Sequence, residues 1–282
     1  MTMTGTWTKI AVGAAGVAVL TTLALGIRRA VMDRRIARTE QALRAEKTGE
    51  VFSEALVDNL PAPAQRYFRH AIQPGTRLAR SVRLQISGRM RPQEGASPID
   101  LTAEETLAPP RGFVWTAQLW MGLVPIRVQD HYAHGDGAVS VHALSIVPLG
   151  RDAGPDVTRS SGGRLAGESV WLPSALLPSS GARWEAVDEA DARVTLTIDG
   201  DPIPLTLQID ETGRLREVTM MRYGDVGVDT WQPLPYGFAV EDEQTFGGYT
   251  IPSALRGGWW YGTDRYDPEE ASCFHIHETS FY

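Results

Sequence analysis

Apolar and polar positions divide the chain into a charge-free N-terminal stretch and a long region of strand-like alternation. Residues 10–27 contain no charged side chain and are followed at once by Arg28 and Arg29. A stretch of this length is close to the minimum for a helix that crosses a ~30 Å hydrocarbon core. We therefore predict one membrane-spanning helix at residues 8–28, within an anchor at residues 1–30. A cleaved signal peptide and a buried core helix remain as alternatives.

The charges on either side of this stretch predict its orientation. Residues 28–47 carry seven basic and three acidic side chains, whereas Lys9 is the only charged side chain before the stretch. Positively charged flanks stay on the cytoplasmic side of a membrane. We therefore expect a single-pass protein of the cell membrane whose globular part lies in the cytoplasm.

Two helical segments are predicted after the anchor. Residues 31–57 are charged and contain no proline, which indicates a helical linker that continues out of the membrane. Residues 64–72 follow Pro61 and Pro63 with an apolar side, which predicts a short second helix, since proline is tolerated in a first helical turn.

From Ser81 onward the apolar residues recur at every second position, which is typical of strands with one buried face. Val82, Leu84 and Ile86, for example, alternate with Arg83 and Gln85. The same reasoning predicts strands at 81–91, 99–107, 112–120, 124–133, 138–147, 183–188, 192–199, 203–209, 215–223, 237–246, 249–261 and 271–280.

These strands predict the fold of residues 58–282: a single, mainly β (α+β) domain built on one antiparallel sheet of ten to twelve strands. The sheet is expected to be strongly curved or to form a half-open barrel. Residues 150–163, rich in Gly, Ser and Asp, are predicted as a loop or a disordered segment, and residues 164–177 as a helix against the sheet. The acidic run 241–243 is interpreted as solvated edge charge.

Charge and lysine content exclude several functions. The chain carries −7 overall, and because Lys9 and residues 28–47 contribute +1 and +4, residues 48–282 carry −12. A domain with this much negative charge repels phosphate groups, which disfavours binding to nucleic acid. Both lysines, Lys9 and Lys47, lie near the anchor, so the domain has no phosphate-binding or Schiff-base lysine. Cys273 is the only cysteine, which excludes an intramolecular disulfide. No cofactor is expected, and the oligomeric state stays open.

Four segments carry a resemblance to an uncharacterised bacterial family of unknown function: Leu60-Pro61 to Arg69, Gly112 to Trp115, Trp171 to Pro178 and Arg183 to Glu185. The likeness covers residues 55–282 and implies no activity, because that family has no assigned catalytic residues. The order of elements is also similar to LolA/LolB-like lipoprotein carriers. That second resemblance implies a half-open barrel with helical lids that holds an acyl chain.

Two polar groups are candidates for chemistry. Cys273, His275 and His277 alternate on a predicted strand, so two imidazoles on one face can share a Zn²⁺ ion, with a third ligand from His131, His134 or Glu168. Asp130 with His131 and His134 can supply a base and the residue that orients it. A polar strand face and a turn explain the same residues, and we therefore predict no metal and no catalytic residue.

Aromatic and leucine side chains are the remaining candidates. The segment 171–178 is bracketed by prolines and suits a lid over an apolar cavity, although it can equally complete the core. We predict a non-enzymatic domain that binds a membrane lipid or an apolar small molecule on the concave face. The alternatives are a structural or protein-interaction module with a filled core and a His-dependent metal hydrolase. The predicted ligand-binding residues are Trp115, Trp171, Leu172, Leu176, Trp184 and Trp259.

Overall fold

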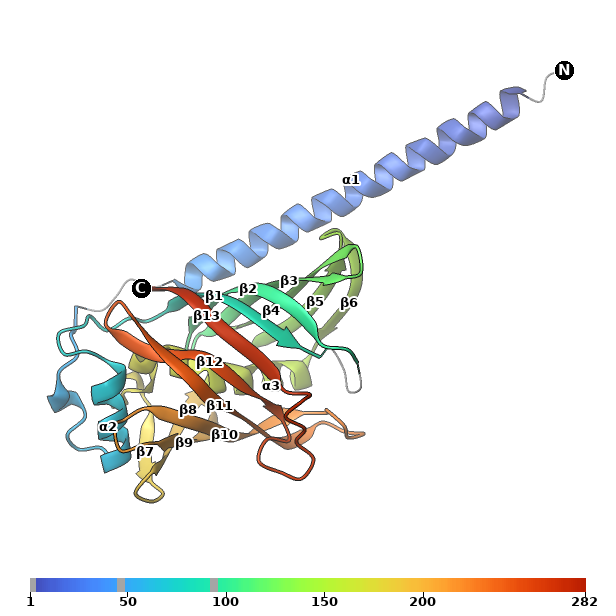
Figure 1. Cartoon of the computed structure of the whole chain (residues 1–282). Coiled ribbons are helices and arrows are strands. Elements are labelled where there is room, and N and C mark those ends of the chain that lie inside the picture. The colour runs from blue at the N-terminus through green and yellow to red at the C-terminus, as the bar shows by residue number, and fades with distance from the viewer. Residues whose placement is uncertain (1–3, 45–48, 92–95) are drawn as a thin grey trace.

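One antiparallel sheet organises the molecule. The computed structural model describes residues 4–44, 49–91 and 96–282, with side chains from Leu23 onward. In that part of the chain thirteen strands form a strongly curved sheet in the order β6-β5-β4-β3-β2-β1-β13-β12-β11-β10-β9-β8-β7 (Figure 1). The strands are β1 Val82–Met90, β2 Ile99–Ala108, β3 Gly112–Met121, β4 Val124–Ala133, β5 Asp136–Ala143, β6 Val147–Ala153, β7 Arg183–Ala186, β8 Asp191–Ile198, β9 Asp201–Ile209, β10 Leu215–Gly224, β11 Gln232–Phe246, β12 Tyr249–Trp259 and β13 Ser272–Phe281. The predicted mainly β, curved antiparallel fold is confirmed.

The sheet consists of two arms that meet where β1 pairs with β13. Strands β1 to β6 run outward to one edge, and β7 to β13 return from the other edge to the middle. The chain between β6 and β7 must therefore cross from one edge to the other. This crossover contains helix α3, Pro155–Gly167, and the 3₁₀ helices η2 Glu168–Trp171, η3 Pro173–Leu176 and η4 Pro178–Ser180. Helix α3 packs against strands of both arms and so lies within the curve of the sheet.

Alternation of side chains explains why most strands form where the sequence predicts them. On β8, Val194, Leu196 and Ile198 are buried, as expected for residues that share one face of a strand. The hairpin between β4 and β5 turns through His134 and Gly135, which both have positive φ. A tight hairpin turn requires such angles because they match the twist of the paired strands.

The strand count and the loop at 150–163 were predicted wrongly. The predicted strand 138–147 is divided into β5 and β6 by a turn at residues 144–146. All residues of β6 are exposed, so this edge strand shows no apolar alternation. The rest of the predicted loop belongs to α3, whose Gly162 and Gly163 let the helix approach the sheet. A Cβ on Gly163 would lie 3.0 Å from Cγ of Arg222.

The predicted helix at 164–177 was also wrong in its geometry. Helix α3 ends at Gly167, and the chain continues as η2 to η4. Pro173 and Pro178 each start one of these short turns, since proline has no N–H for an α-helical hydrogen bond.

A long N-terminal helix, α1 Thr4–Leu43, passes over the convex side of one arm and projects beyond it (Figure 1). The predicted linker helix thus ends at Leu43, whose side chain packs with Ala108 and Val114. Among the described residues no helix is both long and apolar enough to span a membrane. Most of the predicted span, residues 8–28, lies outside the residues whose side chains are described.

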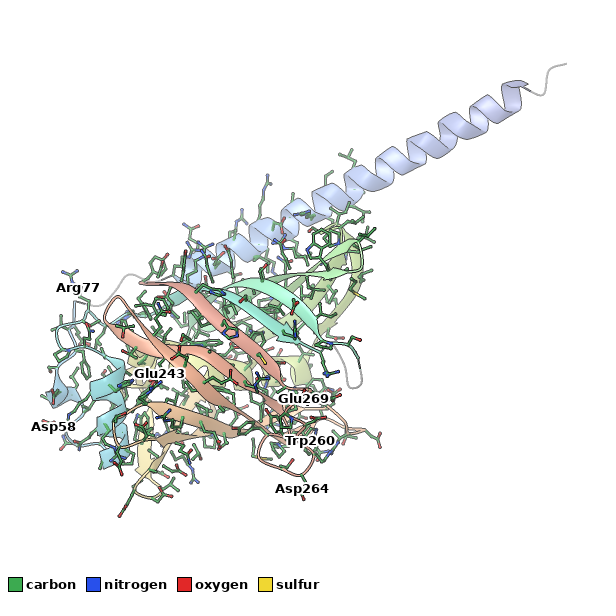
Figure 2. The ribbon with its side chains drawn as sticks, viewed as in Figure 1. Asp58, Arg77, Glu243, Trp260, Asp264 and Glu269 are labelled. Atoms are coloured by element: carbon green, nitrogen blue, oxygen red, sulfur yellow. The ribbon has the colours of Figure 1, made fainter. Side chains whose placement is uncertain are left out.

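Helix α2, Ala62–Ala71, confirms the predicted short helix and packs at the end of the sheet formed by β7 to β9 and β12. Before it lies a 3₁₀ turn, η1 Glu54–Leu56. His70 Nε2 lies 2.8 Å from the Glu243 carboxylate, which also accepts a hydrogen bond from Arg214 Nε at 3.1 Å. Glu243 is labelled in Figure 2. The Glu243 side chain is buried, so its prediction as a solvated edge charge was wrong.

Candidate functional site

The concave face of the sheet holds an apolar cavity of about 400 Å³ beneath the crossover. Its walls come from strands of both arms, so the curvature of the sheet creates it. The volume lies within the usual range of small-molecule sites, about 300–1,000 Å³. The apolar residues that line it are Ile86, Met90, Ile99, Trp115, Leu119, Val128, Val139, Val141, Val170, Trp171, Tyr236, Phe238, Leu255, Trp259 and Phe274.

Three of the predicted ligand-binding residues line this cavity: Trp115, Trp171 and Trp259. The Trp171 indole N–H donates a hydrogen bond to the Pro252 carbonyl at 3.1 Å, so its ring is held in place on the wall. The Trp259 ring occupies space that a side chain at Gly224 would fill, since a Cβ there would lie 2.4 Å from it.

The other three predicted residues lie in the packed core. Leu172 and Leu176 are completely buried and belong to the main hydrophobic cluster. Trp184 packs on Tyr67 and Phe68 of α2, with ring centroids 6.2 and 5.4 Å away. Of the segment 171–178, Trp171 lines the cavity and the rest of the segment does not.

A buried charged cluster borders the cavity and is centred on Arg164 of α3. Its guanidinium lies 2.7 Å from both the Glu168 and the Asp130 carboxylates and 3.5 Å from the Glu105 carboxylate. It also lies over the ring of Trp115, 5.1 Å from the centroid. Because Glu105 is on β2 and Asp130 on β4, one arginine of the crossover links two strands of the same arm.

The cluster has more negative than positive groups, and this affects Glu105. Its side chain is fully buried, and no hydrogen-bond donor among the described residues reaches its Oε2 atom. Burial, together with the nearby negative charge of Glu168, raises the pKa of Glu105 well above its ordinary value. The two carboxyl groups are also within hydrogen-bonding reach of each other. The protonated form of Glu105 is therefore favoured.

We expect the pH dependence of the free energy of unfolding to show that Glu105 is protonated in the folded protein. The unfolded chain releases this proton near the ordinary pKa of 4.5, whereas the folded protein keeps it to higher pH. The folded state thus binds more protons in this window, so the free energy of unfolding decreases as pH rises from about 4.5 to the folded pKa. Urea denaturation across this range should show a shallower decrease for Glu105→Gln than for the wild type.

The neighbouring Glu104→Gln is the matched control, because Glu104 is exposed and pairs with Arg83 at 2.6 Å. This variant should keep the wild-type pH slope. A Glu105→Gln slope equal to that of the wild type would show that the carboxyl group is ionised throughout.

A second arginine, Arg222 of β10, also contacts α3. It stacks on Tyr236 and Trp259, with its guanidinium carbon 4.9 Å from each ring centroid. Its Nε donates a hydrogen bond to the Ser160 carbonyl at 3.2 Å. Within the described chain Arg222 forms no ion pair, and burial lowers its pKa.

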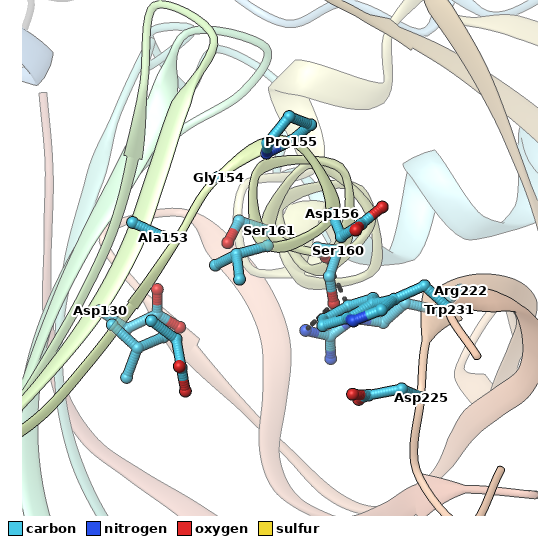
Figure 3. A pocket seen from close by; sticks show the side chains of 13 residues that line it. Asp130, Ala153, Gly154, Pro155, Asp156, Ser160, Ser161, Arg222, Asp225 and Trp231 are labelled. Atoms are coloured by element: carbon cyan, nitrogen blue, oxygen red, sulfur yellow. Dashed lines mark hydrogen bonds between the residues drawn. The ribbon is translucent and has the colours of Figure 1, made fainter. Parts of the chain in front are cut away.

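A polar chamber of about 460 Å³ adjoins the apolar cavity (Figure 3). Its lining includes the start of α3, Trp231, Arg222 and the four aspartates Asp130, Asp152, Asp156 and Asp225. Three residues line both spaces: Asp130, Val139 and Arg222. The two spaces therefore meet at this junction.

The polar candidates on β13 do not assemble into a larger group. His275 and His277 are exposed, and the His277 Nε2 atom lies 2.6 Å from the Ser87 hydroxyl. A bulge in the pairing of β1 with β13 falls at His277. In the described part of the chain, no three His, Cys, Asp or Glu side chains are close enough to share a metal ion.

The second polar candidate is divided between the two faces of the sheet. Asp130 faces the cavity, whereas His131 lies on the outer side near Ile36 and Arg35 of α1. Burial lowers the pKa of His131. His134 occupies the hairpin turn, so these three residues do not form a base and its orienting partner.

Glu105, Arg164 and Arg222 were not predicted as site residues. Arg164 and Arg222 are common surface residue types, whereas Glu105 interrupts the apolar alternation of its strand. One signal was available: Glu105 is a charged residue at an inward position of its strand, next to the buried Leu107 and Ala103. A charge on a buried strand face indicates a partner.

Fold and site together define a class of protein: a single-sheet half-barrel whose crossover covers an apolar cavity next to a buried charged cluster. The chain belongs to a family of unknown function, DUF6544, whose model matches residues 50–268. This confirms the resemblance noted from the sequence. No curated protein matches the chain.

Solved structures give distant similarities. A LolA superfamily protein, NE2245 from Nitrosomonas europaea, is 10% identical, with 78% of this chain and 92% of that one covered at a TM-score of 0.38. A putative outer membrane lipoprotein-sorting protein domain from Vibrio parahaemolyticus is 7% identical (71% and 85% covered, TM-score 0.35). A DUF1329 family protein from Desulfovibrio piger is 9% identical (72% and 86%, TM-score 0.32). Because these TM-scores are below 0.5, none of them supports a statement about what this chain binds.

Proposed function

We propose that this protein is a membrane-tethered, non-enzymatic binding protein that holds the apolar chain of a lipid-like ligand in the concave-face cavity. The observation that carries the proposal is the cavity itself, which is walled mainly by aliphatic and aromatic side chains. Burying an acyl chain there would contribute ~0.8 kcal/mol per methylene. The ligand therefore needs no covalent link and no cofactor to be held.

The tether is proposed from the charge-free stretch at residues 10–27 and the basic residues after it. The part of α1 after this stretch is bound to the sheet: Arg127 of β4 lies 2.9 Å from Asp33, and Arg111 donates a hydrogen bond to the Leu43 carbonyl at 2.7 Å. A helix attached in this way would hold the cavity at a short, defined distance from the bilayer. Such proximity suits a protein that takes its ligand from the membrane.

We expect the cavity to be labelled by a photoreactive acyl chain. Cells that produce the full chain would be grown with a diazirine fatty acid, which they incorporate into their lipids, and then irradiated. Mass spectrometry of the purified protein should find cross-links in the peptides that contain Trp115, Trp171 and Trp259. Replacing Val141 by Trp would fill part of the cavity and should remove most of this labelling.

Val187→Trp is the matched control, since Val187 is 47% exposed in the turn between β7 and β8. It adds the same indole away from the cavity and should leave the labelling unchanged. Cross-links confined to residues 1–30 would contradict the proposal and would favour a structural or protein-interaction module.

The proposed orientation has its own test. Alkaline carbonate should leave the full chain in the membrane pellet, because a spanning helix resists extraction. Protease should degrade the globular domain in inside-out vesicles and spare it in right-side-out vesicles, since the basic flank favours the cytoplasmic side. The opposite protease pattern would reverse the orientation, and release by carbonate would rule out the span.

A further inference from the structure

The apolar cavity and the polar chamber differ in chemistry but share a boundary. Arg222 and Asp130 line both spaces. A ligand with its chain in the cavity would therefore place its polar head first at this boundary and then in the chamber. The charges met along this route constrain which head can bind.

The first charge on the route is the Arg222 guanidinium. Its guanidinium carbon lies 4.9 Å from the ring centroids of Tyr236 and Trp259, and its Nη2 lies 3.5 Å from the Ser160 hydroxyl. Among the described residues no carboxylate pairs with it. An arginine presents a planar fork of donors that matches a phosphate or carboxylate group. Asp130, which lies at the same boundary, is already paired with Arg164 at 2.7 Å. The boundary therefore favours an anionic group that binds Arg222.

Farther along, the chamber is acidic. Asp152, Asp156 and Asp225 lie on its wall, and Figure 3 labels Asp156 and Asp225. Asp130 is 8% exposed, and its Oδ1 atom is buried with no hydrogen-bond donor in the described structure. Trp231 adds an aromatic ring, stacked on Tyr223 at 5.8 Å. Carboxylates and an aromatic ring are the groups that bind an ammonium ion.

We propose that the ligand is a zwitterionic amphiphile, whose acidic group binds Arg222 and whose ammonium group lies among the aspartates of the polar chamber. This inference rests on the proposed function, because it requires the apolar chain to occupy the cavity. A purely anionic head would enter a chamber with four carboxylates, and a purely cationic head would meet Arg222 at the boundary. A head that is anionic next to its chain and cationic beyond it matches both Arg222 at the boundary and the aspartates of the chamber.

The test compares three lipids that carry the same diazirine acyl chain. Their heads are phosphoethanolamine, which is zwitterionic, phosphoglycerol, which is anionic, and trimethylammonium, which is cationic. The full chain in nonionic detergent micelles would be irradiated with a trace of each lipid. We expect the phosphoethanolamine lipid to label the cavity peptides about tenfold more than either of the others, as one additional charge-assisted contact would provide.

Two sets of variants assign the preference to residues. Asp152→Asn combined with Asp225→Asn should bring labelling by the phosphoethanolamine and phosphoglycerol lipids to the same level. Asp229→Asn is the control. It removes one carboxylate from the loop that carries Asp225 but lies outside the chamber, and it should keep the tenfold preference. Arg222→Gln should remove the preference for the phosphoethanolamine lipid over the trimethylammonium lipid, and Arg222→Lys should restore part of it.

The outcomes separate the two proposals. Equal labelling of the cavity by all three lipids, or a preference for a singly charged head, would overturn the zwitterionic ligand and leave the proposed function in place. A lack of cavity labelling with every lipid would overturn the proposed function and this inference together.

Discussion

Replacing Arg164 by Met is expected to lower the free energy of unfolding by about 3–5 kcal/mol. The substitution removes the cation that Glu105, Asp130 and Glu168 share. The Asp130 and Glu168 carboxylates would remain in a water-poor region with no compensating charge. Urea denaturation of wild type and variant, monitored by tryptophan fluorescence, measures the difference.

The matched control is Arg256→Met, because Arg256 pairs with Glu241 at 2.8 Å on the surface. The pair is exposed, so its loss should cost less than about 1 kcal/mol. Adding Glu168→Gln to Arg164→Met should recover part of the lost stability, since it removes one of the unpaired charges. A loss below about 1 kcal/mol for Arg164→Met would show that water reaches the cluster and solvates its charges.

Leu172→Ala should destabilise the fold by about 2–5 kcal/mol, the usual cost of a cavity at a fully buried leucine. Leu172 lies in the crossover and is 0% exposed. Its side chain therefore helps to hold the crossover against the inside of the sheet. The loss would be measured as the shift in the urea midpoint at an unchanged slope.

Leu123→Ala makes the same chemical change in the turn between β3 and β4, where Leu123 is 95% exposed. It should change stability by no more than about 0.5 kcal/mol. Similar effects of the two substitutions would mean that the crossover is not packed in the core.

The regular strands could be predicted from the sequence because each carries its own signal. On β9, Leu205, Leu207 and Ile209 are completely buried and alternate with polar neighbours, as a half-buried strand requires. The edge strand β6 has no such signal, because neither of its faces is buried. Its residues were therefore divided between a neighbouring strand and a loop.

Helix α3 could not be predicted from local preference. Its sequence contains Gly162 and Gly163, and glycine disfavours a helix interior by about 1 kcal/mol. The helix forms because small residues allow it to approach the inner face of the sheet. Packing over a long sequence separation thus outweighs a weak local tendency.

The candidate site illustrates the same limit. Trp115, Trp171 and Trp259 were singled out because large aromatic side chains line or fill cavities, and all three line this one. The charged cluster was missed because its members are far apart in the chain. Glu105 and Arg164 are separated by 59 positions, so the charge at the inward position of Glu105 does not show which residue is its partner.

The sequence by itself determined the mainly β fold, most of its strands, the short helix α2 and the membership of the family. Each of these depends on local periodicity or on short motifs, which are present in the sequence independently of any long-range contact. Only the tertiary structure decided that the crossover runs inside the curved sheet, that Leu172 and Leu176 lie in the core while Trp171 lines a cavity, and that Arg164 joins three carboxylates. These features arise from the order in which thirteen strands pair, and that order brings together residues that no local pattern connects.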